Sequence, residues 1–256
     1  MRIQILGAHN CEAEKTKLPG LLIDNILAID AGSLTSSLSL SEQLELQAIL
    51  LTHHHYDHIR DIPTIAMNAF LHETTINVYS TQTVYDALSN YLLNDELYPN
   101  FLKKPEVDPA IKFTLMSPHH NQQIADYEIL TVQVIHSTSA VGYQITAADG
   151  KTLFYTGDTG PGLAECWRQI SPDLIIIEVT APNRYEEFAR AKGHLTPNLL
   201  GEELGSFQGI NSYIPQVITV HMNPRQENEI ETEIAAMAKA TNYPVRPGHE
   251  GMLIHL

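Results

Sequence analysis

The sequence predicts a layered α/β protein, in which two packed β-sheets carry helices on their outer faces. Two observations support this fold class. Short apolar runs of strand length recur along the whole chain, with helical patterns between them. These elements also form two halves, and in each half charged loops follow the strands, which is typical of two sheets covered by helices.

The expected strands are β-branched and leucine-rich runs that are too short for helices. Several are apolar throughout, so we expect them to be buried on both faces. The runs cover residues 3–6, 21–24, 26–30, 48–52, 76–79, 130–135, 142–147, 152–156, 174–178, 217–220 and 252–255.

The expected helices cover residues 41–47, 61–70, 82–93, 163–170, 197–207 and 223–240. The last is the clearest, because Pro224 suits a first helical position and Ile230, Ile234 and Met237 lie on one stripe. Residues 100–118 contain three prolines and are expected to form a surface excursion or lid. No linker or charge block interrupts the chain, so residues 1–256 are predicted to form a single domain.

The composition excludes several function classes. The chain has 256 residues, 15 Lys and Arg against 30 Asp and Glu, and a net charge of −15, which disfavours sequence-blind binding of nucleic acid. Its two cysteines, Cys11 and Cys166, are isolated, which indicates neither a thiolate zinc site nor a disulfide framework. No leader and no membrane-length apolar run is visible, so a cytoplasmic protein without a membrane partner is expected.

The most informative segment directly follows the apolar run at residues 48–51. It contains His53, His55, Asp57 and His58 within a stretch of six residues. In an extended chain, positions 53, 55 and 57 point to one side, and a turn brings position 58 into the same cleft. Imidazole and carboxylate suit Zn, Mn or Fe, so the segment predicts a metal site.

This His53-x-His55-x-Asp57-His58 pattern resembles the signature of the metallo-β-lactamase superfamily of hydrolases. The resemblance implies a four-layered αββα sandwich with a two-metal site at one sheet edge. It also implies three more ligands that end later strands: His136, Asp158 and His221. The implied assignment is His53, His55 and His136 on one metal, Asp57, His58 and His221 on the other, and Asp158 bridging both.

Two divalent ions are therefore the expected cofactors, with zinc favoured and manganese or iron as alternatives. Such a pair can lower the pKa of a shared water, which Asp57 and Asp158 would orient or deprotonate. Oxygen-reducing di-iron members of the superfamily usually carry Glu where this chain has His55. A hydrolase is favoured.

Two further residues indicate the substrate. Glu178 ends a predicted strand, and His194 precedes a predicted helix. The pair is similar to one in ribonuclease Z and related phosphodiesterases, where a Glu orients a His that protonates the leaving alkoxide. Residues 93–101, 157–161 and 193–197 also resemble class II cyclic-nucleotide phosphodiesterases. We therefore expect Asp57, Glu178 and His194 to be catalytic in hydrolysis of a small phosphodiester such as a cyclic nucleotide.

The sequence leaves alternatives open. The same metals would serve a ribonuclease Z-like RNA endonuclease or a lactone or thioester hydrolase. A mononuclear-iron dioxygenase that uses only the first metal site and a non-enzymatic binding or regulatory protein that keeps the fold are further alternatives. Tyr98 and Phe101 either stack on a base or fill a core, Arg60 either contacts a phosphate or pairs locally, and His249 is a candidate for lining the site. A homodimer is expected.

Overall fold

The computed structural model describes residues 1–256 and contains two β-sheets. In the first sheet, β1 pairs antiparallel with β14 and β2, whereas β3 to β6 run parallel. Its strands are β1 (Arg2–Gly7), β2 (Gly20–Ile23), β3 (Leu27–Ile29), β4 (Ala48–Leu50), β5 (Ile76–Ser80), β6 (Ile111–Leu115) and β14 (Leu253–His255), in the order β14-β1-β2-β3-β4-β5-β6.

The second sheet is built from the middle and the end of the chain. Its strands are β7 (Asn121–Ile124), β8 (Tyr127–Gln133), β9 (Val141–Thr146), β10 (Thr152–Tyr155), β11 (Leu174–Glu178), β12 (Gln216–Val220) and β13 (Val245–Pro247), in the order β13-β12-β11-β10-β9-β8-β7. Strands β10 to β13 are parallel. Their carboxyl ends therefore meet at one edge of the sheet.

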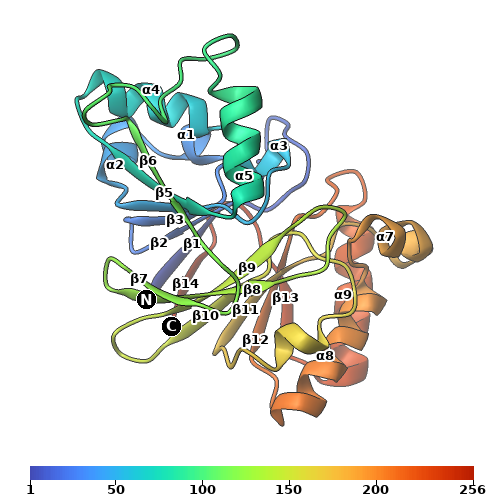
Figure 1. Ribbon diagram of the computed structural model, residues 1–256. Coiled ribbons are helices and arrows are strands. Elements are labelled where there is room, and N and C mark those ends of the chain that lie inside the picture. Colours follow the sequence, from blue (N-terminus) through green and yellow to red (C-terminus); the bar gives the residue numbers. More distant parts are fainter.

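Helices cover the outer face of each sheet (Figure 1). On the first sheet lie α1 (Leu34–Ser37), α2 (Leu40–Glu45), α4 (Ile62–Leu71) and α5 (Gln82–Ala87), which continues into the π-helical turn η1 (Leu88–Leu92); the short α3 (Tyr56–Ile59) lies at its edge. The second sheet carries α6 (Ala164–Trp167), η2 (Asn183–Tyr185), α7 (Glu186–Lys192), α8 (Pro197–Asn211) and α9 (Glu227–Thr241).

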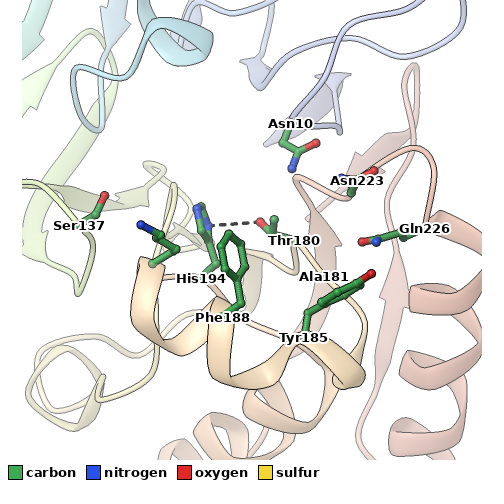
Figure 2. Close-up of a pocket in the computed structure, with 10 residues that line it drawn as sticks. Asn10, Ser137, Thr180, Ala181, Tyr185, Phe188, His194, Asn223 and Gln226 are labelled. Atoms are coloured by element: carbon green, nitrogen blue, oxygen red, sulfur yellow. Dashed lines mark hydrogen bonds between the residues drawn. The ribbon is translucent and has the colours of Figure 1, made fainter.

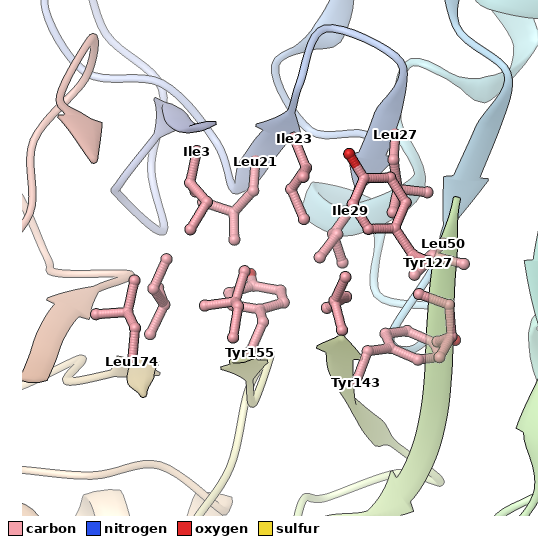
Figure 3. Close-up of a cluster of buried hydrophobic side chains, with 14 of the residues drawn as sticks. Ile3, Leu21, Ile23, Leu27, Ile29, Leu50, Tyr127, Tyr143, Tyr155 and Leu174 are labelled. Carbon is pink, nitrogen blue, oxygen red and sulfur yellow. The ribbon is translucent and has the colours of Figure 1, made fainter. Parts of the chain in front are cut away.

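Successive side chains of a strand point alternately into the core between the sheets and into the core under the helices. A cluster of 23 buried residues joins the two inner faces, with Ile3, Leu21 and Ile29 packed toward Tyr155 and Leu174 (Figure 3). Two further clusters, of 22 and 20 residues, join each outer face to its helices. The predicted fold class, a four-layered αββα sandwich, is confirmed.

Two sequence-based expectations need correction. Of residues 100–118, only 103–108 form an exposed surface segment, because β6 pairs with β5 over Ile111–Leu115 and Phe101 is 2% exposed in the outer core. Tyr98 packs against the same core, so both aromatics fill the core rather than line a site. Helix α9 begins at Glu227 instead of residue 223, since the side chain of Asn223 accepts from the Arg225 N–H and forms a turn.

Several elements escaped the sequence patterns. Strand β7 is largely polar, β13 has three residues, and α7 packs only Ala189 into the interior, so none has a strong apolar period. No helix combines the length and the apolar character that a membrane span requires.

Candidate metal centre

Seven predicted ligands meet at the edge where the two sheets come together. All of them lie shortly after a strand ends. Two lie in the segment after β4, two lie in α3, which follows that segment, and one each follows β8, β10 and β12. They form two groups that share one carboxylate, and within each group the candidate ligand atoms lie within 4.8 Å of one another. The groups are His53, His55, His136 and Asp158, and Asp57, His58, Asp158 and His221.

Asp158 directs one carboxylate oxygen to each group. Its Oδ1 lies 3.1 Å from His58 Nε2 and 3.3 Å from His221 Nε2. Its Oδ2 lies 3.7 Å from His53 Nε2 and 3.9 Å from His136 Nε2. This arrangement is the one that a carboxylate bridging two cations requires.

The remaining ligands complete the two groups. His55 Nδ1 lies 3.2 Å from His136 Nε2, on the side of the first group. Asp57 Oδ2 lies 3.4 Å from His221 Nε2 and 3.7 Å from His58 Nε2, on the side of the second. The first group is thus rich in neutral nitrogen ligands, and the second adds a further carboxylate.

Buried polar atoms without partners show that the residues fit metal ions. His53 Nε2, His58 Nε2 and Asp158 Oδ1 are buried and make no well-directed hydrogen bond, although the last two lie 3.1 Å apart. Leaving such atoms unpaired in an interior is costly, and cations placed between them would satisfy all three. Burial, reinforced by neighbouring imidazoles, holds the pKa of His53 well below its usual range, so its lone pair is free to bind.

Asp30 supports the second group from behind. Its Oδ2 accepts from His58 Nδ1 at 2.7 Å, and the carboxylate also accepts from the Thr52 N–H at 2.9 Å and the Tyr155 hydroxyl at 3.1 Å. Such contacts fix the ring orientation of a metal-binding histidine. We did not single out Asp30 from the sequence, although it ends a predicted strand just as the ligands do.

Two of the ten non-glycine residues with positive φ lie at this edge. Asp30 and His221 both have positive φ, 59° and 65°, which residues other than glycine rarely adopt. Gly193, at φ 74°, accepts from His136 Nδ1 at 2.8 Å. A Cβ on Gly193 would lie 2.9 Å from the His136 Cα, so only glycine allows this close approach.

Glu178 and His194 form a hydrogen-bonded pair beside the second group. His194 Nδ1 donates to Glu178 Oε1 at 2.6 Å, and Glu178 also accepts from the backbone N–H groups of Thr159 and Leu195. Burial lowers the pKa of His194, but the Glu178 carboxylate outweighs burial and raises it to about 9. The His194 ring stacks on His221 with 5.7 Å between centroids.

Thr180 links this pair to the ligands. Its hydroxyl donates to Glu178 Oε2 at 2.8 Å and accepts from His221 Nδ1 at 2.8 Å. Sequence reasoning missed Thr180, because a lone threonine two residues after a strand has no distinctive pattern. The contact fixes the ring orientation of His221 and leaves its Nε2 to face Asp57 and Asp158.

A cavity of about 590 Å³ opens next to His194 (Figure 2). Its lining includes the aromatic residues Tyr185 and Phe188 and the amides Asn10, Asn223 and Gln226. None of these five was identified from the sequence. They come from η2, α7 and the loops after β1 and β12, which lie far apart in the chain.

Other residues considered from the sequence lie outside the centre. Arg60 forms ion pairs with Glu12 and Asp61, so of its two alternatives the structure favours pairing within the protein. His249 is exposed, and its Nδ1 donates to the Glu250 carbonyl.

His9 is buried between two carboxylates rather than facing the ligands. It lies 2.6 Å from Glu250 and 3.0 Å from Glu227.

Comparison with known proteins supports this architecture. A family model described as "Beta-lactamase superfamily domain" matches residues 21–226. A "UPF0173 metal-dependent hydrolase" from Chloroflexus aurantiacus is 30% identical over 140 residues, which is 52% of this chain and 53% of that protein. The match thus spans about half the length of the curated relative.

Solved structures resemble the whole chain. Unliganded yeast PDE1 superposes with a TM-score of 0.84 and 17% identity, covering 100% of this chain and 99% of that one. The metallo-beta-lactamase fold protein YhfI from Bacillus subtilis gives a TM-score of 0.79 and 16% identity, with 99% of each chain covered. At such low identity these likenesses show the fold.

Proposed function

The chain belongs to the beta-lactamase superfamily, and on that premise we propose that it is a dinuclear metal-dependent hydrolase of small phosphodiesters. The observation that carries the reaction type is the Glu178–His194 pair beside the ligands. A phosphodiester with an alkoxide leaving group needs a proton donor, because an alkoxide is a poor leaving group. Hydrolysis of a lactone or a thioester on the same ligands would not need this pair.

Two divalent ions, held by the two groups that share Asp158, would supply an activated water and neutralise charge on the phosphoryl oxygens. Zinc fits the nitrogen-rich ligand set best, and manganese or iron are alternatives. Asp57, whose side chain is 26% exposed, is placed to orient the attacking water. Asp158 is buried and shared, so its role is to hold the two groups in register.

His194 acts on the leaving group. Its Nδ1 is occupied by Glu178, so its Nε2, which has no partner in the chain, is the atom that gives up a proton. Glu178 is fixed by two backbone N–H groups and in turn holds the imidazole in one orientation. Proton donation of this kind contributes about 10²–10⁴-fold to a rate.

The test compares leaving groups in the metal-loaded protein and its His194→Ala variant. We expect the variant to lose about 10²–10⁴-fold in kcat on a cyclic mononucleotide. It should lose far less on bis-p-nitrophenyl phosphate, because p-nitrophenolate departs without a proton. Metal content should stay unchanged, and His249→Ala, an exposed histidine outside the centre, serves as the matched control.

Three outcomes would overturn the proposal. One is robust lactone turnover with no diester turnover in the wild-type protein. Another is an equal loss on both diesters in His194→Ala, which would remove the proton-donor role. Cleavage of precursor transfer RNA without cleavage of any small diester would favour an RNA endonuclease.

A further inference from the structure

We propose that the cavity beside His194 is a nucleobase subsite, in which Tyr185 and Phe188 stack on the base while Asn10 and Gln226 bind its edge. The inference rests on the proposed function, since it names the part of the substrate that the metal ligands do not touch. Nothing in the superfamily membership assigns these four residues.

The position of the cavity connects it to the reacting centre. His194 and Thr180 line it, and both contact Glu178 in the pair described above. A diester whose phosphate lies among the metal ligands, with its leaving oxygen near His194, therefore extends one substituent into this cavity. The volume of about 590 Å³ falls within the range of about 300–1,000 Å³ that small-molecule sites have.

Two aromatic rings form one wall. Tyr185 and Phe188 are 41% and 61% exposed, so neither is needed to fill the core. Both stand on the η2–α7 side of the cavity, with the amides on the other side (Figure 2). Stacking of a base on an aromatic ring contributes about 1–3 kcal/mol, so these two solvent-exposed rings would stabilise a bound base.

Unpaired amides form the opposite rim. Asn10 Oδ1 is buried and has no hydrogen-bond partner. The Gln226 side chain also has none, although it lines the cavity next to the start of α9. Asn and Gln each offer a donor beside an acceptor, which matches a base edge such as that of adenine, where an amino group adjoins a ring nitrogen.

The rim is held in place by the His9 pair. His9 precedes Asn10 in the chain, and its Nε2 lies 3.0 Å from Glu227, which follows Gln226. Its Nδ1 lies 2.6 Å from Glu250, whose carboxylate also accepts from the Ala8 and Lys17 backbone N–H groups. The loop after β1 and the start of α9 are thereby tied together, which fixes the spacing of the two amides.

The charge of the lining also fits a nucleotide. The chain carries a net charge of −15, yet no Asp or Glu lines the cavity. Lys192 is its only residue with a permanent positive charge. A cavity without carboxylates on an acidic protein favours an anionic ligand over a cationic one.

The test uses 3′,5′-cyclic AMP and its baseless counterpart, methyl riboside 3′,5′-cyclic phosphate, with the metal-loaded full chain. We expect a lower KM for cyclic AMP in the wild-type protein. Phe188→Ala and Gln226→Ala should each raise that KM by about 5- to 100-fold, as loss of one stacking or edge contact implies, with kcat unchanged. The KM of the baseless compound should not change.

A matched control and a second readout keep this separate from the proposed function. Tyr91→Ala removes another exposed aromatic ring, 71% exposed in η1, and should change neither KM. Calorimetric binding of AMP should weaken in Phe188→Ala and Gln226→Ala whether or not any diester is cleaved. Equal KM values for both compounds, or AMP binding that neither variant weakens, would overturn the subsite even if diesters are hydrolysed.

Discussion

The metal centre and the cavity beside it are neighbours built in opposite ways. In the centre, His53, His58 and Asp158 are almost fully buried, and the rings of His53, His58 and His136 are each held by a second contact through Nδ1. In the cavity, Phe188 and Gln226 are accessible, and Gln226 has no hydrogen-bond partner. Reacting groups need fixed positions, whereas recognition tolerates side chains that adjust to a ligand.

The largest effect is expected from Asp158→Asn, which removes the carboxylate shared by both groups. Loss of a charge that holds both cations should cost several kcal/mol of transition-state stabilisation, or at least about 10³-fold in kcat. Turnover of the diester and elemental metal content measure it together. Asp126→Asn, at an exposed turn, is the control, and retention of two ions with normal turnover in Asp158→Asn would contradict the bridging role.

A smaller effect is expected from Asp30→Asn, which weakens the direct support of His58. Loss of such a contact typically reduces metal affinity or activity by about 10–100-fold. We expect the ion held with His58 to be removed by a chelator first, because Asp30 contacts His58 directly and reaches His53 only through the Thr52 hydroxyl. Simultaneous loss of both ions in a chelator titration would show that the two groups are not supported separately.

The stabilisation that His9 gives to the rim of the cavity should depend on pH. The Glu250 and Glu227 carboxylates outweigh burial and raise the pKa of His9, so its stabilisation is present below pH 6.5 and is lost as pH rises through the raised value. Burial raises the pKa of Glu250, but the contacts with His9 and the hydrogen bond from the Lys17 backbone together outweigh burial and lower it, so its share is present above pH 4.5 and lost as pH falls.

His9→Gln should therefore destabilise the protein most between about pH 4.5 and 6.5, by about 1–3 kcal/mol, and less at pH 9. Urea unfolding at pH 6 and pH 9 measures this difference. His72→Gln, an exposed histidine outside the site, should show no such pH dependence. A destabilisation that is equal at both pH values would show that the His9 charge does not hold the rim.

The smallest effect is expected from Arg60→Ala. Arg60 pairs with the exposed Glu12 and with the buried Asp61, which keeps a second hydrogen bond from the Thr35 N–H, so the free energy of unfolding should fall by about 1 kcal/mol. Because both partners lie outside the centre, kcat and KM for the diester should not change. A raised KM would show instead that Arg60 contacts the substrate phosphate.

The same contrast explains what the sequence could predict. All seven ligands follow apolar strands, and a ligand at the end of a buried strand combines two signals, one from hydrophobic pattern and one from residue type. Asp30 carries both signals and differs from the ligands only in its tertiary contacts, whereas Thr180 has no distinctive residue type, so their contacts with His58 and His221 emerge from the fold.

The cavity could not be predicted in this way. Tyr185, Phe188, Asn10 and Gln226 are ordinary surface residues in sequence, and only the pairing of distant segments brings them together. Conversely, Tyr98 and Phe101 had a suggestive local context but fill the outer core, where Phe101 packs against Phe70 of α4. Local pattern identifies ligands that strands position, while recognition surfaces depend on tertiary contacts.

The number of divalent ions bound per chain tests the central claim most directly. We predict two per wild-type chain by elemental analysis after metal loading and dialysis, because two groups of buried ligand atoms share Asp158. A value of zero or one for correctly folded protein would contradict a dinuclear centre.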